Sequence, residues 1–384
     1  MSAALIAAIP WLAIPLLLTW RMRGSPRLRD EIALRKSESP LVTVVIPARN
    51  EARNIALCMQ SVLRSHYPSV EVVVVDDRSS DGTGIIAREV SRNDKRARVI
   101  DAPPLPDGWL GKQWACNQGA AIARGELLCF TDADTLHGSE LLTRSVALLR
   151  NHQVDFVTVA GRQRLVGFWE RVVQPHIFTM LALRYGGPAE VNRSPRTVDK
   201  IANGQFMLFT RAAYDEVGGH EAVRGRVAED LALAQLLFER GKRTVVALGL
   251  EQLSTRMYGS LGEIVRGWMK NIYAGALDAA PFGAFGRALL PLALLATPCA
   301  MLAPVVVLVL AAFGLASSGA LVWAAACTAI LLLWWALSYL MAARISPMYA
   351  FTFPLGAAVV IYIVLRAVSR GTRVEWKGRE YRLQ

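Results

Sequence analysis

Uncharged apolar runs near both ends of the chain enclose a middle part in which the spacing of hydrophobic positions changes repeatedly. No charged residue stands between Ala3 and Trp20, or between Ala288 and Ala343. A bilayer's hydrocarbon core is roughly 30 Å thick, which about 20 helical residues span. The first run therefore predicts one membrane span. The second predicts two spans with a turn near Gly314 to Gly319, and a third apolar run follows from Pro347 to Leu365.

Between residues 41 and 285, short β-branched runs alternate with stretches of helical spacing. The predicted strands are Leu41–Ile46, Val72–Val75, Arg98–Ile100, Leu127–Phe130 and Phe156–Val159. After the first strand, Ile55, Met59, Val62 and Leu63 recur at helical spacing. This alternation predicts an α/β domain with a mostly parallel, Rossmann-like sheet that helices cover on both faces. In such sheets ligands bind beyond the carboxyl ends of the strands.

Carboxylates follow three of these strands, whereas the strands themselves hold almost none. Glu51 comes shortly after the first strand, Asp76 and Asp77 follow the second, and Asp132 and Asp134 follow the fourth. Neither Gly-x-Gly-x-x-Gly nor a P-loop is present, which argues against a dehydrogenase or a P-loop protein. Two carboxylates so close repel each other unless a cation joins them, and Mg²⁺ often links one or two carboxylates to phosphate oxygens. We therefore expect a divalent cation at Asp132 and Asp134; the alternative is a solvated acidic turn.

Two further segments hold candidate chemistry. Lys112 precedes the fourth strand and is suited to contact a phosphate as a point charge, although a lone lysine is commonly just solvated. Glu229 and Asp230 open an amphipathic helix that continues to Phe238. Asp230 is the candidate general base; the alternative is that both acids only interact with the helix dipole.

In this order and spacing, the segments resemble the family 2 glycosyltransferases of the GT-A fold. The resemblance runs from about Val42 to Gly275. The segments that carry it are Ile46–Glu51, Val74–Thr83, Lys112–Gly119, Thr131–Asp134, Asn203–Phe206, Gly218–His220 and Glu229–Asp230.

The resemblance implies a role for each candidate residue. The residues that would bind the nucleotide-diphosphate sugar, linked to UDP or GDP, are Pro47, Glu51, Asp76, Asp77, Lys112, Asp132 and Gly204. Among them, Asp77 would lie near the base and Lys112 at the diphosphate. Asp134, with Asp132 beside it, would hold Mg²⁺ or Mn²⁺. Asp230 would be the base of a direct displacement that inverts the anomeric carbon.

Other features narrow the expected reaction. Processive members of the family carry Gln-x-x-Arg-Trp after the base motif, whereas this chain reads Ile264-Val265-Arg266-Gly267-Trp268. Only three apolar segments follow the domain, so transfer of a single sugar is favoured over a polymer channel. Gly108–Lys112 and Trp376–Arg379 resemble the branch linked to hopanoid and carotenoid lipids, which implies a lipid hydroxyl as acceptor, of hopanoid, carotenoid or glycerolipid type. The alternatives are a polyprenyl-phosphate sugar synthase and a catalytically silent membrane scaffold.

Charge and cysteine usage place the protein at a membrane. The net charge is +12, but many Lys and Arg residues flank apolar segments, which suits anionic headgroups better than nucleic acid. The five cysteines show no Cys-x-x-Cys spacing and are expected to be buried thiols in a reducing compartment. Basic residues follow the first apolar run rather than precede it, which predicts an uncleaved anchor with a cytosolic domain behind it. We expect an integral protein of the bacterial inner (plasma) membrane.

The expected organisation has five parts. They are a transmembrane anchor at 1–22, a GT-A domain at 41–258, an interfacial amphipathic segment at 259–286, transmembrane segments at 287–368 and a basic tail at 369–384. Residues 162–200, rich in Arg and aromatic side chains, either lie at the headgroups or cover the domain.

Two features of the sequence predict opposite sides of the membrane for the tail. Three spans after a cytosolic domain would place the tail outside, yet its basic residues favour the cytosol. We expect a cytosolic tail, with Trp376 and Tyr381 buried near the catalytic domain. Either Pro347–Leu365 is a re-entrant or interfacial segment, or Ala288–Ala343 contains an additional crossing.

Overall fold

The chain forms two structural units in the computed structural model, which describes residues 3–32, 39–278, 280, 282–370, 373–376 and 379–382. The sheet unit comprises residues 24–164, 188–257 and 372–384. The helical unit comprises residues 1–23, 165–187 and 258–371.

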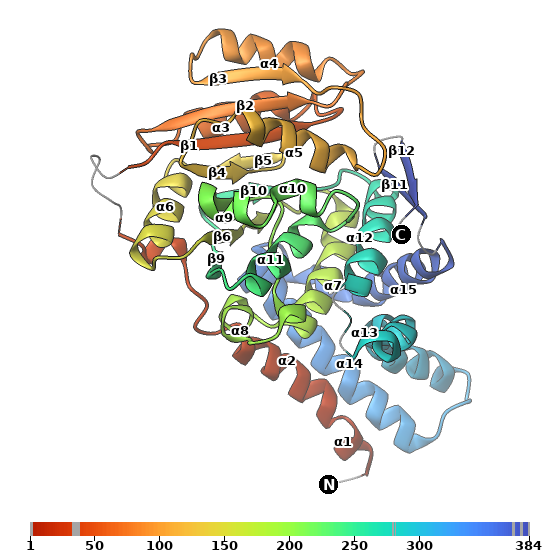
Figure 1. Ribbon diagram of the computed structural model, residues 1–384. Helices are drawn as coiled ribbons and strands as arrows, with labels where there is room; N and C mark the ends of the chain where they lie inside the picture. The colour runs from red at the N-terminus through yellow and green to blue at the C-terminus, as the bar shows by residue number, and fades with distance from the viewer. Residues whose placement is uncertain are drawn as a thin grey trace. The chain divides into compact units, whose positions relative to one another are not determined.

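A seven-stranded sheet organises the sheet unit, in the order β3-β2-β1-β4-β8-β6-β9 (Figure 1). Its strands are β1 (Val42–Ala48), β2 (Val70–Asp76), β3 (Ala97–Asp101), β4 (Leu127–Phe130), β6 (Phe156–Ala160), β8 (Met207–Thr210) and β9 (Thr244–Leu248). Neighbouring strands are parallel except where β8 pairs with β4 and β6. A smaller sheet has the order β5-β10-β7, with strands β5 (Thr135–His137), β7 (Arg162–Gln163) and β10 (Leu253–Thr255).

Helices cover both faces of the large sheet because its central strands are apolar on both sides. The helices of this unit are α3 (Ile55–Leu63), α4 (Thr83–Arg92), α5 (Gly111–Ile122), α6 (Leu141–Asn151), α8 (Pro188–Arg193), α9 (Arg211–Glu216), α10 (Gly219–Ala222) and α11 (Glu229–Glu239). Val44 of β1 packs in a core with α3 and α6, whereas the next residue, Val45, packs in a second core with α5 and α11. Strands buried on both faces are typical of a parallel sheet between helical layers.

The strand order brings the carboxyl ends of β1, β2 and β4 together at one end of the sheet. β1 is followed by β2 on one side and is flanked by β4 on the other. In open α/β sheets, ligands bind beyond the carboxyl ends of the strands at such a switch point. The acidic segments after β1, β2 and β4 therefore meet along one edge.

Polar side chains close the outer edge of the sheet at β9. Asn192 accepts from the backbone N–H of Val246 (2.8 Å) and donates to its carbonyl (3.0 Å). The backbone N–H of Leu248 donates to the carbonyl of Pro26. These contacts occupy groups that an exposed edge strand would otherwise present to another chain.

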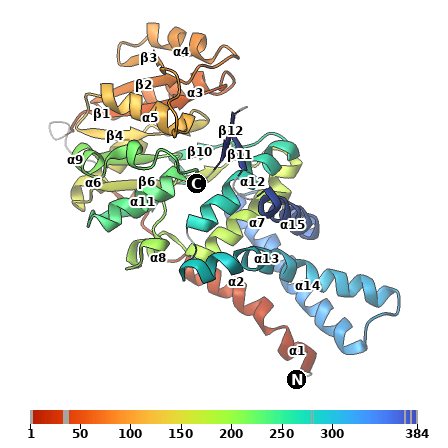
Figure 2. The same ribbon diagram turned by 45° about the vertical axis from the view of Figure 1, so that its right-hand side comes forward.

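Four helical segments of the helical unit are long and apolar enough to cross a membrane: Ala3–Arg21, Gly283–Ala312, Ser318–Ala343 and Pro347–Arg370. The helices of this unit are α1 (Ala3–Ala7), α2 (Ile9–Arg21), α7 (Phe168–Tyr185), α12 (Leu261–Asp278), α13 (Gly283–Ala312), α14 (Ser318–Ser338) and α15 (Phe353–Arg370). α13 and α14 form an antiparallel pair joined by a short turn (Figure 2). A π-helical turn (Tyr339–Ala343) extends α14, and a 3₁₀ turn (Pro347–Thr352) leads into α15.

Side-chain donors take carbonyls that prolines leave free in these helices. Pro175 has no N–H for the carbonyl of Arg171, and the hydroxyl of Tyr339 donates to that carbonyl instead (2.9 Å). Pro304 likewise leaves the carbonyl of Ala300 to the indole N–H of Trp11 (3.1 Å). Such replacement matters in an apolar medium, where an unpaired carbonyl has no water to bind.

The structure confirms five strands of the sequence analysis, although the first begins at Val42 rather than Leu41 and ends at Ala48, and it confirms the turn between the first two C-terminal spans. It shows β8 and β9 in addition. The predicted re-entrant hairpin is wrong, because α15 is one continuous helix from Phe353 to Arg370. The predicted extra crossing within Ala288–Ala343 is also wrong, because α13 and α14 use this length as two long helices.

The predicted domain at 41–258 differs from the observed division at α7, which belongs to the helical unit. The reason is close packing inside that unit. A Cβ on Gly356 of α15 would lie 2.4 Å from the carbonyl of Val172, so only glycine permits this approach. The first C-terminal span also begins earlier than residue 287, at Gly283. The tail contains a hairpin of β11 (Arg373–Trp376) and β12 (Arg379–Arg382), and the expected burial of Trp376 and Tyr381 concerns side chains outside the described part of the chain.

Candidate active site

The loop after β1 and the turn after β2 are joined by hydrogen bonds. The backbone N–H of Glu51 donates to the hydroxyl of Thr83 (2.8 Å). In the opposite direction, the backbone N–H of Ser80 donates to the side chain of Asn50 (2.9 Å). Asn50 has a positive φ of 53°, a conformation that asparagine tolerates better than most residues. The two segments therefore form one wall, and Pro47 stands at the end of β1 beside it.

Asp76 and Asp77 are both buried, with exposed fractions of 6% and 1%. Asp76 accepts from the backbone N–H of Ser79 (3.1 Å), and its other oxygen lies 2.3 Å from where a Cβ on Gly84 would be. Asp77 lies 3.8 Å from the guanidinium of Arg49. In this structure Asp76 shapes the turn into α4, so the predicted contact of this pair with a nucleoside stays a prediction.

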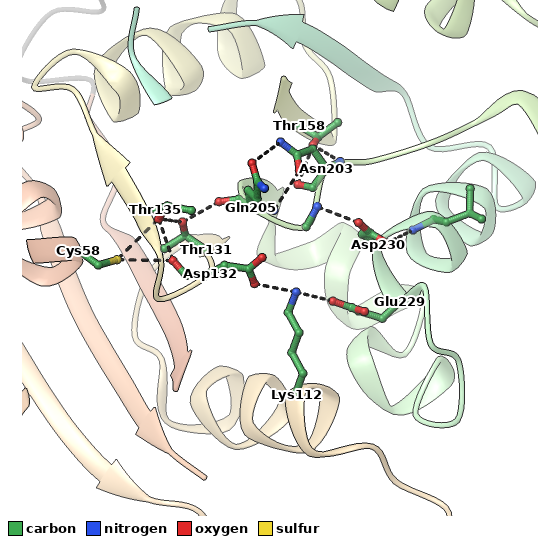
Figure 3. A network of polar contacts seen from close by, with 12 residues as sticks. Cys58, Lys112, Thr131, Asp132, Thr135, Thr158, Asn203, Gln205, Glu229 and Asp230 are labelled. Atoms are coloured by element: carbon green, nitrogen blue, oxygen red, sulfur yellow. Dashed lines mark hydrogen bonds and ion pairs between the residues drawn. The ribbon is translucent and has the colours of Figure 1, made fainter. Parts of the chain in front are cut away.

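The hydroxyl groups of Thr131 and Thr135 anchor the segment that contains Asp132 (Figure 3). The hydroxyl of Thr131 donates to the carbonyl of Gln205 (2.7 Å), and the hydroxyl of Thr135 donates to the carbonyl of Asp132 (2.8 Å). The Nε2 atom of His137 lies 2.9 Å from the Thr131 hydroxyl. Because the Thr131 proton goes to Gln205, His137 is the donor in that contact, and Nε2 carries its proton. The loop is thus fixed before any ligand arrives.

Asp134 suits a cation. Its Oδ1 atom is buried and has no hydrogen-bond partner among the described residues. Burial and the nearby charge of Asp132 raise the pKa of Asp134 to about 8, which shows that the carboxylate lacks compensation. Within the described ranges no group of three or more His, Cys, Asp and Glu side chains is arranged to hold a metal. The residues therefore fit an ion such as Mg²⁺ that takes few carboxylates and completes its shell with phosphate oxygens.

Lys112 connects two carboxylates from different parts of the chain. Its Nζ atom lies 2.7 Å from Oδ1 of Asp132 and 2.7 Å from Oε1 of Glu229 (Figure 3). Burial opposes the charge, but the negative charges of Asp132 and Glu229 outweigh it and hold the pKa of Lys112 well above its ordinary value. Lys112 is therefore a fixed cation at this edge of the sheet.

Asp230 is held by two backbone donors, the N–H of Gly204 (2.9 Å) and the N–H of Leu231 (2.8 Å). A Cβ on Gly204 would lie 3.1 Å from Oδ2 of Asp230 and 3.2 Å from Nζ of Lys112, so any side chain at this position would crowd both groups. Burial and the charge of Glu229 raise the pKa of Asp230 to about 6. A carboxylate with such a pKa is suited to accept a proton near neutral pH.

Most of the predicted site residues thus meet in one cluster. Lys112, Asp132, Gly204 and Asp230 are within contact of one another or of Glu229. The charge of Glu51 also raises the pKa of Asp134, after burial and Asp132, so Glu51 lies within electrostatic reach of the cluster. Asp76 contacts Ser79 in the neighbouring turn, and Asp77 faces Arg49.

The sequence analysis assigned no separate catalytic or binding role to Glu229, and it did not predict that Asn203 supports the bend before Gly204. Glu229 stands beside Asp230, and this adjacency was the available signal. Asn203 donates to the carbonyl of Val159 (2.8 Å) and so fixes the bend that presents Gly204. No pattern in the sequence indicates that contact, because its partner is a backbone group 44 positions away.

Comparison with known proteins gives matches of three kinds. Residues 43–218 match the model of glycosyl transferase family 2. A 4,4'-diaponeurosporenoate glycosyltransferase of Staphylococcus aureus (strain USA300) is 28% identical over 255 residues, which are 62% of this chain and 63% of that protein. The match thus spans less than two thirds of the relative's length. Among solved structures, a mannosyltransferase from Pyrobaculum calidifontis in complex with GDP-Man and Mn²⁺ has a TM-score of 0.58 at 22% identity, covering 95% of this chain and 98% of that one.

The sheet order and the likeness to this solved structure define the class of fold, a GT-A-like α/β domain. Over residues 43–218, which are less than half of the chain, the sequence is similar to glycosyl transferase family 2.

Proposed function

We propose that this protein is a membrane-bound inverting glycosyltransferase that moves one sugar from a nucleotide-diphosphate sugar to a hydroxyl group of a lipid. The observation that carries the proposal is the position of Asp230. It is a base candidate with a pKa of about 6, and it stands close to the cation Lys112, since a Cβ on Gly204 would lie 3.1 Å from Oδ2 of Asp230 and 3.2 Å from Nζ of Lys112.

The charge of the cluster supports a donor with a diphosphate. Among the described residues, Asp132 and Glu229 pair with the cation Lys112, and Asp134 and Asp230 lie nearby, which leaves three negative charges if all four acids are ionised. Entry of a diphosphate would add to this repulsion. A bound Mg²⁺ or Mn²⁺ at Asp134 and Asp132 would supply the positive charge that offsets it and stabilises the leaving diphosphate.

The chain's own residues perform the remaining steps of the proposed reaction. Glu51 and the Asp76–Asp77 turn, with Pro47, form the wall for the nucleoside. Asp230 accepts the proton of the acceptor hydroxyl, whose oxygen bonds to the anomeric carbon. The bond from that carbon to the diphosphate oxygen breaks in the same displacement, and the ammonium of Lys112 faces the charge that develops on the leaving group.

A lipid acceptor is supported by two observations. Four helical segments are long and apolar enough to cross a membrane. The relative from Staphylococcus aureus acts, by its name, on a carotenoid acid. We place the protein in the bacterial inner membrane with the sheet unit in the cytosol, because Arg21, Arg23, Arg27 and Arg29 follow the first span.

The test uses the full chain in detergent micelles with Mn²⁺. UDP-glucose and GDP-mannose serve as donors, and the acceptors are a hopanoid alcohol, a hydroxylated carotenoid, 4,4'-diaponeurosporenoate and a polyprenyl phosphate. Sugar transfer to a hydroxyl acceptor is expected. Asp230→Asn should lower kcat for that transfer by at least about 100-fold, the lower end for loss of a general base.

The acceptors differ in whether they need a base, which makes the test selective. A carboxylate or phosphate acceptor is already an anion, so its glycosylation should depend little on Asp230. Transfer to the polyprenyl phosphate alone would replace the proposal with a polyprenyl-phosphate sugar synthase. If neither donor is turned over, the remaining alternative is a catalytically silent membrane scaffold. Asp215→Asn, which changes an exposed acid on α9, is the matched control and should retain full activity.

A further inference from the structure

We propose that Glu229 is a positioning residue that fixes the ammonium of Lys112 where it meets the diphosphate of the donor. This inference rests on the proposed function, since it assigns a role to Glu229 toward that donor. It adds a second carboxylate with a task distinct from that of the adjacent base, Asp230.

The geometry leaves one donor of Lys112 available. A lysine ammonium has three N–H groups. Asp132 and Glu229 each lie 2.7 Å from Nζ, and no other described residue accepts from it. Gly204 lies beside the same ammonium: a Cβ on this residue would be 3.2 Å from Nζ of Lys112. Two carboxylates thus hold the ammonium, which leaves its third N–H for a ligand, and the side chain of Lys112 is still 23% exposed.

Glu229 differs from Asp132 in how firmly it is held. The side chain of Glu229 is 7% exposed, whereas that of Asp132 is 30% exposed. Asp132 is also a candidate ligand of the cation, which would compete for its oxygens. Glu229 is therefore the partner suited to keep Lys112 in place once the donor is bound.

Backbone contacts set the distance between Lys112 and Glu229. The N–H of Leu110 donates to the carbonyl of Arg224 (3.0 Å), and the side chain of Gln113 donates to the carbonyl of Arg226 (2.5 Å). Gln113 is itself buried, at 2% exposure. The start of α5, on either side of Lys112, is consequently joined to the segment that leads into Glu229 and α11.

Simple electrostatics would predict the opposite effect for this residue. A carboxylate near a diphosphate repels it, so removing Glu229 should strengthen nucleotide binding if its charge were all that mattered. A positioning role predicts weaker binding, because a long lysine side chain that is no longer held loses more conformational freedom when the ligand arrives. The sign of the change therefore separates the two.

The experiment measures the Kd of UDP and of GDP, each with Mn²⁺, by calorimetry on the full chain in detergent. Glu229→Ala should raise the Kd of the preferred nucleotide by about tenfold, the scale of one hydrogen bond to a charged group. Glu229→Gln keeps an acceptor oxygen and the size of the side chain, so it should raise the Kd less. In a Lys112→Met background, Glu229→Ala should raise the Kd no further.

Two results would overturn the assignment: tighter nucleotide binding by Glu229→Ala, or the same fold increase in Kd with and without Lys112. Glu216→Ala removes the partner of Lys242 on the surface and should leave the Kd unchanged, as the matched control for losing a Glu–Lys pair. If the unmodified protein binds neither nucleotide, the proposed donor class itself is wrong, and the role of Glu229 falls with it. Retained thermal stability of Glu229→Gln separates a positioning effect from loss of folding.

Discussion

At the scale of single residues, the site is defined by a cluster of acids whose negative charge the neighbouring Lys112 only partly balances. Asp132, Asp134, Glu229 and Asp230 are acids from two distant segments of the chain, and Lys112 is the cation within contact of this cluster. Removal of these groups from water raises the pKa of Asp134 and of Asp230. Perturbed acids clustered at a strand end are typical of a functional site.

Asp230 should give the reaction an acid limb in its pH dependence. Its pKa is raised to about 6, and a base works only when deprotonated. The rate of transfer to a hydroxyl acceptor should therefore rise with pH through about 6 and level off above it. The measurement is kcat/KM from pH 5 to 8. An unchanged profile for transfer to an acceptor that is already ionised is the control, and a flat profile with the hydroxyl acceptor would contradict the role of Asp230.

Asp134 should make donor binding depend on a divalent cation. Its buried Oδ1 has no partner among the described residues, so an ion is the compensation that the site lacks. Excess chelator should weaken nucleotide binding in the unmodified protein, and Asp134→Ala should remove the difference between binding with and without Mn²⁺. Calorimetry measures both. Full activity and full nucleotide affinity in chelator would show that Asp134 holds no metal.

The sequence was sufficient to find the acids at the strand ends but not the contacts between them. Asp132 and Asp134 directly follow a buried strand, a local signal. The pairing of Lys112 with Glu229 joins positions more than a hundred residues apart, and it depends on two loops that fold across the same edge. The fixed turn around Asp76 was also beyond prediction, because it depends on how closely Gly84 approaches.

At the scale of secondary structure, periodicity predicted the parallel half of the sheet well. The strands β1 and β2 are continuous β-branched runs, and such runs are the clearest strand signal. β8 (Met207–Thr210) was missed because a short apolar run does not by itself distinguish a strand from a buried helix; β4 is equally short, but it fitted the alternation of strands and helices, which is interrupted before β8. The antiparallel direction of β8 is set by its partners and has no signature of its own.

The helical unit should depend on donors that replace the N–H groups missing at prolines. In α7, the hydroxyl of Tyr339 takes the carbonyl of Arg171 that Pro175 leaves free. Tyr339→Phe removes this donor and should lower the free energy of unfolding by about 1–3 kcal/mol, the cost of an unsatisfied buried group. A lower thermal midpoint in detergent measures the effect. Tyr362→Phe, at a half-exposed position of α15, should leave the midpoint unchanged; equal midpoints for both variants would refute the idea.

At the scale of the whole molecule, the direction of α15 decides on which side the tail lies. Within the helical unit, α15 packs against α13 as well as against α7 and α12. α13 and the segment that contains α15 are candidate spans, whereas α7 and α12 are not and carry charged residues such as Arg171 and Arg266. On the charge of the basic tail, we propose that α15 lies along the membrane interface rather than across the bilayer.

Cysteine labelling tests this orientation. Gln384→Cys, in a background with Cys299→Ser because the other native cysteines are buried, should resist an impermeant maleimide in spheroplasts and react after permeabilisation. Leu315→Cys, in the exposed turn between α13 and α14, should react in both conditions and is the positive control. Labelling of Gln384→Cys in intact spheroplasts would show that α15 crosses the membrane.

Indole hydrogen bonds join the first helical segment to α13 and α14, so this segment is a packed member of the helical bundle as well as a membrane anchor. Trp11 donates to the carbonyl of Ala300 (3.1 Å), and Trp323 donates back to the carbonyl of Ala7 (3.3 Å). A chimaera in which an unrelated signal anchor replaces residues 3–21 would still be inserted by the translocon. It would, however, leave the Ala300 carbonyl beside Pro304 bare in hydrocarbon. The graft would thus deliver the protein to the same membrane with a weakened bundle, because insertion needs only an apolar segment whereas packing needs Trp11.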